Sequence, residues 1–287
     1  MRNRPVRSLR APLVLAAAFL TLPAGLLAQQ DWRSITQSRQ VGTEELLHVA
    51  VQYGAGRLIL GRGSDGLLYK ATLGYDGQAF KPELTYSPGS LRVGLDDVRV
   101  RGRNVRLGEL RLDLGPTVPI DLRLEFGAAR ADVDLTGLRI RRLRLATGAS
   151  ETRLHVGAPN AEVCESVDLH VGAAKFDAIG LGNLNARRLD FNGGVGDVTL
   201  DFTGEWASDM AATVRMGLGS LTLRVPRGLG LRVEKGGLLV GFDSQGLIKR
   251  GDVFYSENWE SADRKLTLDI EAAFGAIRVQ WVDGNQN

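Results

Sequence analysis

The sequence is poor in cysteine, the residue that small domains use for stabilising disulfide cross-links. Cys164 is the only cysteine among 287 residues, so no disulfide can form within the chain. Aromatic residues make up only 6% of the chain, and after the first thirty residues no apolar run reaches the roughly 20 residues of a membrane-spanning helix. The fold must therefore be stabilised by packing alone.

An excess of basic residues is also lacking once the N-terminus is set aside. The chain has 36 Lys and Arg against 33 Asp and Glu, but four of the arginines lie in its first ten residues. Without residues 1–28, which contain no acid, 32 basic residues (36 minus 4) face 33 acidic ones, a net charge of −1. A nucleic-acid groove needs sustained Lys and Arg, so we expect no nucleic-acid partner.

The first 28 residues have the pattern of a secretory signal peptide. An arginine-rich start is followed by an apolar stretch from Ala11 to Leu27 and by the small residue Ala28. Pro12 and Pro23 make the stretch too short for a membrane anchor. Gln29 stands where a lipoprotein needs Cys. We expect cleavage after Ala28 and a periplasmic or extracellular protein with no integral membrane span.

The rest of the chain divides into three regions. Residues 29–44 are polar without a sustained period, which predicts a flexible lead-in. Residues 45–125 alternate apolar and polar residues, as in Leu47, Val49 and Val51, which predicts an N-terminal β region that continues or caps the following repeats. No segment keeps a helical apolar stripe, so the protein is expected to be all-β.

Residues 126–287 contain an internal repeat. Its segments align on one glycine with spacings of 21, 24, 22 and 23 residues, and the anchoring residues are Gly127, Gly148, Gly172, Gly194 and Gly217. Further copies begin at Tyr53, Lys235 and Phe274. Short strands in repeats of about 22 residues predict a single-stranded parallel β-solenoid, or β-helix, whose coils stack. A β-sandwich is the structural alternative, and it predicts hairpin connections instead.

Stacked coils bring equivalent residues into columns. One predicted outward column holds Arg144, Asp168, Asp190 and Arg215, and a second holds Asp132, Arg153 and Asp177. The alignment also places Cys164 in an apolar column with Ile140, Ala186 and Ala211. We therefore expect Cys164 to be buried and unreactive.

These repeats resemble those of the toast-rack family of bacterial envelope proteins. The resemblance rests on the aligned glycine segments, on GLGSLTLRVPRGLGLRV from Gly217 to Val233 and on the ending FGAIRVQW from Phe274. The segment from Leu46 to Asp76 is similar to the family's N-terminal part. More loosely, the repeats resemble head domains of proposed adhesins and the C-terminal domain of cell-wall stress response membrane proteins. The resemblance implies a β-solenoid in the envelope and no catalytic residues.

Several motifs could carry chemistry, and each has a simpler structural interpretation. Gly61, Gly63 and Gly66 match dinucleotide-fingerprint spacing, but strand-like residues follow where a helix is needed, so we expect a turn. NGGVGD, from Asn192 to Asp197, is similar to calcium-binding repeats but has no tandem copy, so we expect no calcium site. No cofactor is predicted.

The histidines and the close carboxylates are treated in the same way. A metal site needs three or four converging donors. The three histidines lack neighbouring ligands in such a spacing and are expected on exposed strand positions: His48, His155 and His170. The carboxylate pairs Asp96 with Asp97 and Asp132 with Asp134 need no catalytic explanation, because neighbouring strand positions face opposite sides or solvent. No catalytic, cofactor-binding or metal residue is assigned.

The sequence thus favours a non-enzymatic exported solenoid that presents a binding or structural surface to an envelope polymer or protein. The alternative is a carbohydrate-active enzyme, of the polysaccharide lyase or hydrolase type, on the same scaffold. An outer groove with clustered carboxylates would favour the enzyme, and a ladder of mixed charge would favour the binder.

Export provides the first test. Because residues 1–28 have the charged, apolar and small-residue parts of a signal peptide, the exported protein should begin at Gln29. Intact-mass spectrometry of protein recovered from the periplasm and from the medium measures this directly. Recovery of a chain that still carries Met1 would contradict the assignment.

Overall fold

The computed structural model describes residues 31–97, 107–237 and 239–283. The predicted signal peptide, residues 1–28, lies outside the described residues. The described part forms one compact unit of β-strands with a single 3-10 helix, η1. The elements are β1 Trp32–Gln40, β2 Leu47–Arg62, β3 Leu67–Asp76, β4 Phe80–Ser87, β5 Ser90–Asp97, β6 Gly108–Leu114, β7 Ile120–Asp134, β8 Ile140–His155, β9 Ser166–Ile179, η1 Leu181–Leu184, β10 Arg188–Asp201, β11 Met210–Pro226, β12 Gly230–Gly236, β13 Leu239–Asp243, β14 Leu247–Arg250, β15 Val253–Ser256 and β16 Lys265–Val282.

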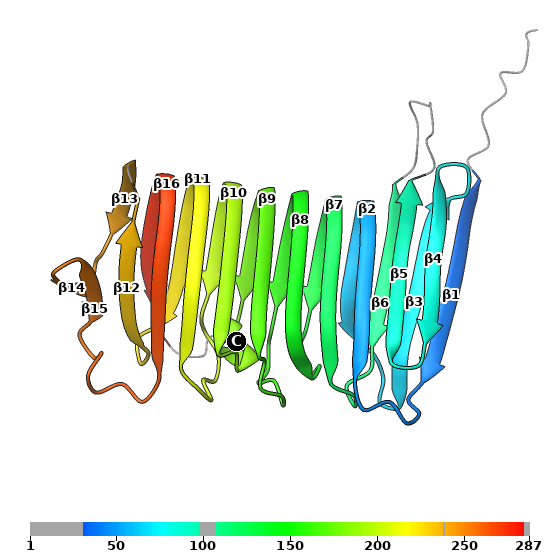
Figure 1. The fold of residues 1–287 in the computed structure, drawn as a ribbon, viewed down its shortest axis with the longest axis horizontal. Helices are drawn as coiled ribbons and strands as arrows, with labels where there is room; N and C mark the ends of the chain where they lie inside the picture. Colours follow the sequence, from blue (N-terminus) through cyan, green and yellow to red (C-terminus); the bar gives the residue numbers. More distant parts are fainter. Residues whose placement is uncertain (1–30, 98–106, 238, 284–287) are drawn as a thin grey trace, which may run out of the picture. The chain divides into compact units, whose positions relative to one another are not determined.

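All strands belong to one mixed sheet, so the protein is all-β as expected. The middle of the sheet is parallel and runs β2-β7-β8-β9-β10-β11-β16 (Figure 1). Antiparallel pairs occur near the two ends, where β4 pairs β5, β3 pairs β1 and β6, and β15 pairs β12 and β14.

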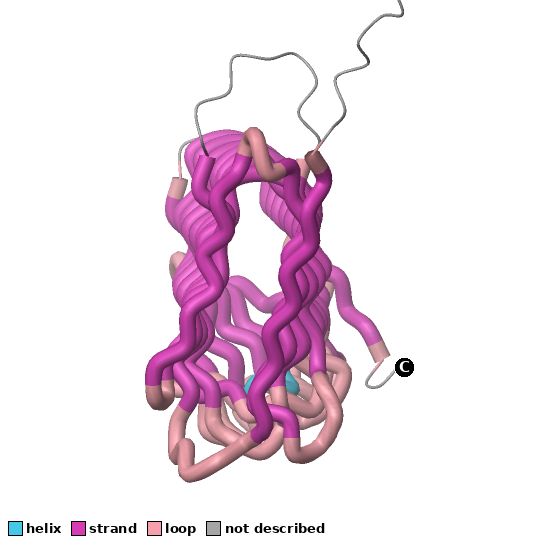
Figure 2. The backbone as a smooth tube through the Cα atoms, turned by 90° about the vertical axis from the view of Figure 1, so that its right-hand side faces the viewer, coloured by secondary structure: helices cyan, strands magenta, loops and turns pink. Residues whose placement is uncertain are grey.

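Each long strand of the middle bends once, so that its two halves lie in two facing layers (Figure 2). We call the bend the arch. Layer A contains the first halves of these strands together with β4, β5 and β12. Layer B contains their second halves together with β1, β3, β6 and β13.

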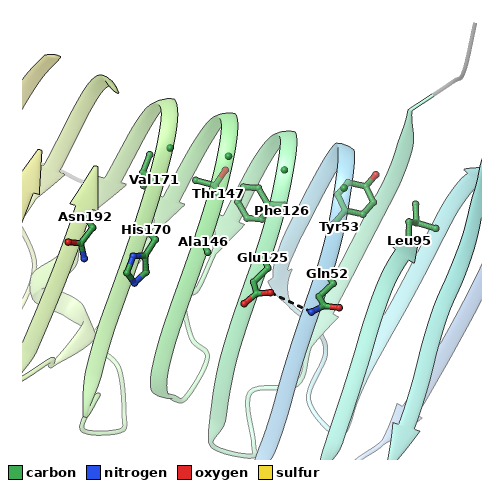
Figure 3. A pocket seen from close by; sticks show the side chains of 14 residues that line it. Gln52, Tyr53, Leu95, Glu125, Phe126, Ala146, Thr147, His170, Val171 and Asn192 are labelled. Carbon is green, nitrogen blue, oxygen red and sulfur yellow. Dashed lines mark hydrogen bonds between the residues drawn. The ribbon is translucent and has the colours of Figure 1, made fainter. Parts of the chain in front are cut away.

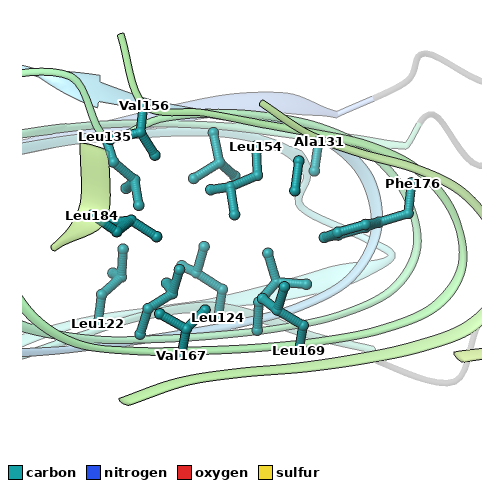
Figure 4. Packing of buried hydrophobic residues seen from close by; sticks show 14 of the residues in the cluster. Leu122, Leu124, Ala131, Leu135, Leu154, Val156, Val167, Leu169, Phe176 and Leu184 are labelled. Atoms are coloured by element: carbon teal, nitrogen blue, oxygen red, sulfur yellow. The ribbon is translucent and has the colours of Figure 1, made fainter. Parts of the chain in front are cut away.

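The core fills the space between the layers. In β7, Leu122 and Leu124 are buried on the layer A side, and Ala131 is buried on the layer B side (Figure 4). The intervening residues are more exposed, which is the period-2 alternation seen in the sequence. The same pattern recurs in β8, β9 and β10, so one apolar cluster runs through the stack. Burying these side chains is the main stabilising contribution, at about 25 cal/mol per Å² of apolar surface.

The pairing register confirms most of the predicted columns. Arg144 pairs with Asp168, and Asp168 with Asp190. In layer B, Arg153 pairs with both of its predicted neighbours, Asp132 and Asp177.

One predicted pair is wrong by two residues. Asp190 pairs with Thr213, whereas Arg215 pairs with Asn192. A slip of two residues keeps every side chain on its own face, so apolar alternation cannot distinguish the two registers. The glycines can, because Gly194 and Gly217 have the 23-residue spacing that places Asp190 beside Thr213. For the same reason Ala211 pairs with Arg188, whereas Ala186 does pair with Cys164.

The N-terminal lead-in is a second correction. Instead of being irregular throughout, residues 29–44 include strand β1, which pairs antiparallel with β3 along the edge of layer B. Its residues are nearly all exposed, so they lack the alternation by which a strand is recognised. Polar, charged edge strands also resist pairing with other chains.

The strands near both ends do not stack in chain order. β2 lies between β7 on one side and β5 with β6 on the other. At the other end, the C-terminal strand β16 lies between β11 and the preceding strands β12 and β13. Both segments fold back into the sheet, and repeat spacing alone does not predict this arrangement.

Cys164 is fully buried, as predicted. Burial raises the pKa of its thiol to about 12, so the reactive thiolate is scarce at neutral pH. Its lack of reactivity stays a prediction.

The arch glycines supply a stability test. Gly219 has φ +141°, and a Cβ there would lie 1.9 Å from the carbonyl oxygen of Gly196. We expect Gly219→Ala to lower the free energy of unfolding by about 2 kcal/mol or more. Gly61 is the matched control, because a Cβ there has nothing within 4 Å, and Gly61→Ala should change stability by less than about 0.5 kcal/mol. Urea denaturation of both variants measures this, and equal midpoints would contradict the steric argument.

Glu44 supplies a pH test. Its carboxylate accepts hydrogen bonds from the Tyr86 hydroxyl at 2.6 Å and the Gly42 backbone N–H at 2.6 Å, which lower the pKa of Glu44 to about 2. A lowered folded-state pKa stabilises the protein above the unfolded value of about 4.3. That contribution is lost as the pH falls through about 2.

Tyr86→Phe keeps the ring that packs against Tyr69 and Arg39 but removes the hydroxyl. The variant should therefore lose less stability between pH about 4.5 and about 2 than the unmodified protein does. Urea midpoints across this pH range measure the difference. Tyr255→Phe, at the other end of the sheet, is the control. A pH dependence unchanged by Tyr86→Phe would show that this hydrogen bond does not set the Glu44 pKa.

Candidate functional site

An open groove follows the layer A side of the arch across the parallel strands (Figure 3). Its first part has a volume of about 750 Å³ and extends from β5 and β2 to β10. Its second part, of about 660 Å³, continues from β10 to β12 and β16. Asn192 lines both parts, so we treat them as one feature, the arch groove.

The floor of the arch groove consists of the glycines that mark the sequence repeat, except on β16, where Ala273 takes this position. A Cβ on Gly127 would lie 2.5 Å from the carbonyl oxygen of Gly54. For Gly194 the corresponding distance, to Gly172, is 2.8 Å, and for Gly217, to Gly194, it is 2.6 Å. A side chain at these positions would push neighbouring strands apart. Glycine is therefore required for close stacking, and its absent side chain leaves the floor open.

One wall of the groove is a column of side chains two residues before each floor position. The pairing register places these residues directly beside one another on seven successive strands: Gln52, Glu125, Ala146, His170, Asn192, Arg215 and Glu271. Figure 3 shows the first five projecting on the same side of the strands. Because neighbouring strands lie about 4.7 to 4.9 Å apart, the wall presents a group at each such interval.

The ends of this wall are internally paired and its middle is not. Gln52 donates a hydrogen bond to Glu125 at 3.4 Å, and Arg215 lies 3.4 Å from Glu271. Within the described part of the chain, no hydrogen bond or ion pair engages the side chains of His170 and Asn192. Their imidazole and amide groups are available to a ligand.

An apolar ridge lies beside the floor, one residue further along each strand. Val195, Leu218 and Phe274 are in register there, with exposed fractions of 52%, 50% and 49%. Towards the N-terminal strands the same column narrows to alanines such as Ala173. Apolar side chains in a continuous exposed row are uncommon on a protein surface that has no partner.

The charges of the groove are few and mixed. Its wall carries Glu125, Arg215 and Glu271, a net charge of −1 with His170 neutral. Glu125 and Glu271 are five strand spacings apart, about 24 Å. Across residues 31–97, 107–237 and 239–283, no three His, Cys, Asp or Glu side chains gather as metal ligands.

The predicted turn is confirmed, because Gly63 and Gly66 lie between strands β2 and β3, just after Gly61, the last residue but one of β2. The NGGVGD segment is part of strand β10 and crosses the arch. Asp96 and Asp97 lie in β5, opposite Lys81 and Phe80.

The histidines occupy outward strand positions as expected. His48 lies 3.4 Å from Asp121, and His155 lies 3.3 Å from Asp134. Asp132 lies 3.8 Å from Arg57.

His170 instead lines the arch groove, which sequence reasoning missed. The signal was present, since His170 and Asn192 each stand two residues before a repeat glycine.

The part of the chain that the structure describes contains no helix long and apolar enough to span a bilayer.

Several solved structures resemble this one weakly. A proposed cell adhesion protein from Clostridium sporogenes is 17% identical, with a TM-score of 0.45 over 88% of this chain and 100% of that one. A proposed adhesin from Bacteroides fragilis is 14% identical, with a TM-score of 0.44 over 86% and 97%. A proposed lipid binding protein from Parabacteroides distasonis is 8% identical, with a TM-score of 0.28 over 85% and 97%.

The search of curated proteins gives no match. A family model does match, under the description "N-terminal domain of toast_rack, DUF2154", over residues 28–177 and 160–224. These residues are more than half of the chain, and they include the strands whose glycines form the floor of the arch groove. The chain therefore belongs to the toast-rack family.

Proposed function

We propose that this protein is a non-enzymatic exported protein of the bacterial cell envelope whose arch groove binds a neutral polysaccharide chain. The observation that carries the proposal is the wall of the groove, which stays in register over seven strands. A surface that repeats at one short interval suits a ligand that is itself long and repetitive.

The groups along the groove favour a ligand with hydroxyl groups and little charge. His170 and Asn192 offer unengaged polar groups beside an open glycine floor. The net charge of −1 on the wall gives a polyanion no electrostatic advantage. The ridge of Val195, Leu218 and Phe274 adds apolar surface on which the faces of sugar rings can lie.

An extended peptide is less suited to this groove than a sugar chain. Peptides that bind to sheets usually add a strand to an edge with free backbone groups. The groove instead crosses the parallel strands, whose backbone groups are already paired with neighbouring strands. Recognition there depends on side chains.

The groove also favours a binder over the carbohydrate-active enzyme. Glycoside hydrolysis ordinarily needs two carboxyl groups about 5 to 9.5 Å apart. The carboxylates Glu125 and Glu271 are about 24 Å apart along the wall, by the spacing of strands in a sheet. This mixed ladder is the arrangement expected of a binding surface.

We further propose that the parallel strands form a single-stranded β-solenoid of about 22 residues per coil, consistent with pairing offsets of 21, 24, 22 and 23 residues from Leu122 through Leu143, Val167 and Leu189 to Ala212. The N-terminal β region from 45 to 125 then continues this stack and caps it. Cleavage of residues 1–28 would release it as the exported form.

A bulky residue in the wall tests the binding proposal. The probe is a set of linear neutral oligosaccharides titrated calorimetrically into residues 29–287. We expect at least one to bind, and Ala146→Trp to weaken it about tenfold or more, a change of about 1.4 kcal/mol. Ala146 lies in the wall and can be enlarged without entering the core.

Thr222→Trp is the matched control, since Thr222 lies on layer B, five residues beyond the floor glycine Gly217 on the same strand. It should bind the same oligosaccharide unchanged. Absence of binding by every oligosaccharide, or equal binding by the Ala146→Trp variant, would refute the proposal.

A further inference from the structure

The outer face of layer A carries a column of charges that are separated by sign. Along the stack, its residues are Arg92, Ala50, Arg123, Arg144, Asp168, Asp190, Thr213, Asp269 and Glu234. We call this the charge column. All the arginines lie on one half and all the carboxylates on the other. We propose that this face binds the same face of a second copy of this chain. The two stacks run in opposite directions, so that β5 of one copy lies near β16 of the other.

Within a single chain the charge column is unfavourable. Arg123 pairs directly with Arg144, Asp168 with Asp190, and Asp269 with Glu234. Like charges directly opposite each other on neighbouring strands destabilise a sheet. These three contacts therefore destabilise the sheet of a monomer.

The column is compensated only in part by its surroundings. Arg123 is paired with Glu125, and Glu234 lies 2.8 Å from Arg232. Asp168 accepts a hydrogen bond from Ser166 at 3.4 Å. Among the described residues, no hydrogen bond or ion pair engages the side chains of Arg144, Asp190 and Asp269. These groups are therefore available to a partner.

A two-fold axis between β8 and β9, parallel to the strands, makes the column complementary to itself. It would set Arg144 of each copy opposite Asp168 of the other, and Arg123 opposite Asp190. One step further, the uncharged Ala50 would face the uncharged Thr213. At the periphery, Arg92 would face Asp269. Arg123, Arg144, Asp168, Asp190 and Asp269 would each thus face an opposite charge on the second copy, whereas Glu234 would face the uncharged Thr85.

The neighbouring columns of layer A obey the same symmetry. On the side away from the arch, the axis sets Asp121 opposite Arg188. On the side of the arch it sets Gln52 opposite Arg215, and Glu125 opposite Asn192. The operation places no pair of like charges together in these columns. If the two stacks ran in the same direction, arginines would instead face arginines. The charges therefore specify stacks that run in opposite directions.

Layer B does not have this property. Its corresponding column alternates in sign, with Arg153 between Asp132 and Asp177, and with Arg278 beside Asp243. Those charges are balanced within one chain. The contrast identifies layer A as the face that needs a partner.

The face is large enough for a specific dimer. Eight strands from β5 to β16 span about 35 to 40 Å, and their layer A halves are about 20 Å long. The resulting area of roughly 700 to 800 Å² per copy is close to that of a standard protein interface. The two-fold axis also leaves both arches at the same end, so the two arch grooves would run side by side. Gln52, Glu125, Asn192 and Arg215 also line the arch groove, so a ligand in the groove would compete with the second copy for these side chains. The dimer is therefore tested without oligosaccharide, and its result is independent of the binding proposal.

Charge reversal tests the interface. Residues 29–287 should sediment as a dimer at low salt in analytical ultracentrifugation and dissociate further as salt is raised. The variants Arg123→Glu with Arg144→Glu, and Asp168→Arg with Asp190→Arg, should each be monomeric. Mixed together they should form a heterodimer, because each column is then complementary to the other. Arg57→Glu with Arg278→Glu changes the charge of layer B equally and should leave the dimer intact.

A cross-link gives a second measurement that does not require the reversed variants to fold. Facing sheets lie about 10 Å apart, so Ala146→Cys residues near the axis should be joined by a short bis-maleimide. Ala276→Cys on layer B should not be joined, and the unmodified protein, in which buried Cys164 is the only cysteine, is the blank. A protein that is monomeric at low salt, a dimer indifferent to both reversals, or cross-linking only through Ala276→Cys would overturn the proposal.

Discussion

The structure depends on how closely the backbones of successive strands approach at the arch. Glycine is needed there because the carbonyl oxygen of the preceding strand in the stack occupies the space of a Cβ, as at Gly127 and Gly217. This contact fixes which residue lies beside which on neighbouring strands. The apolar core, the wall of the arch groove and the charge column all follow from that register. Since alternation alone tolerates a shift of two residues, the glycines give the sheet its single alignment.

Much of this could be predicted from the sequence, because the information is local and periodic. The glycine spacing gave the correct offsets between strands, and the buried position of Cys164 followed from its column. Arg215 was predicted beside Asp190 but lies beside Asn192, because the prediction aligned the apolar pairs and not the glycines. Only the glycines distinguish registers that differ by two residues. Strand β1 was not predicted, because an exposed edge strand has no buried face and so shows no alternation of apolar and polar residues. The fold-back of β2 and β16 depends on pairing between distant segments, which no local period encodes.

The two outer faces use charge for different purposes. On layer B, opposite charges alternate between neighbouring strands and support the register of one chain, as around Arg153. On layer A, like charges are neighbours, and the chain tolerates the repulsion because the apolar core between the layers is continuous. A stable scaffold can thus carry a surface that is unfavourable in isolation, provided that function supplies the compensating charges.

The place of β16 has a consequence for the order of events in time. This strand is synthesised after both β11 and β12, yet it occupies the position between them. Until it arrives, β11 has an open edge and β12 has no parallel neighbour, so the C-terminal end of the stack cannot close on a nascent chain. Closure of this part of the sheet therefore waits for the synthesis of β16. Termination after Gly236 but before Lys265 would leave β11 and β12 without the strand that pairs with both, and open to pairing with other chains.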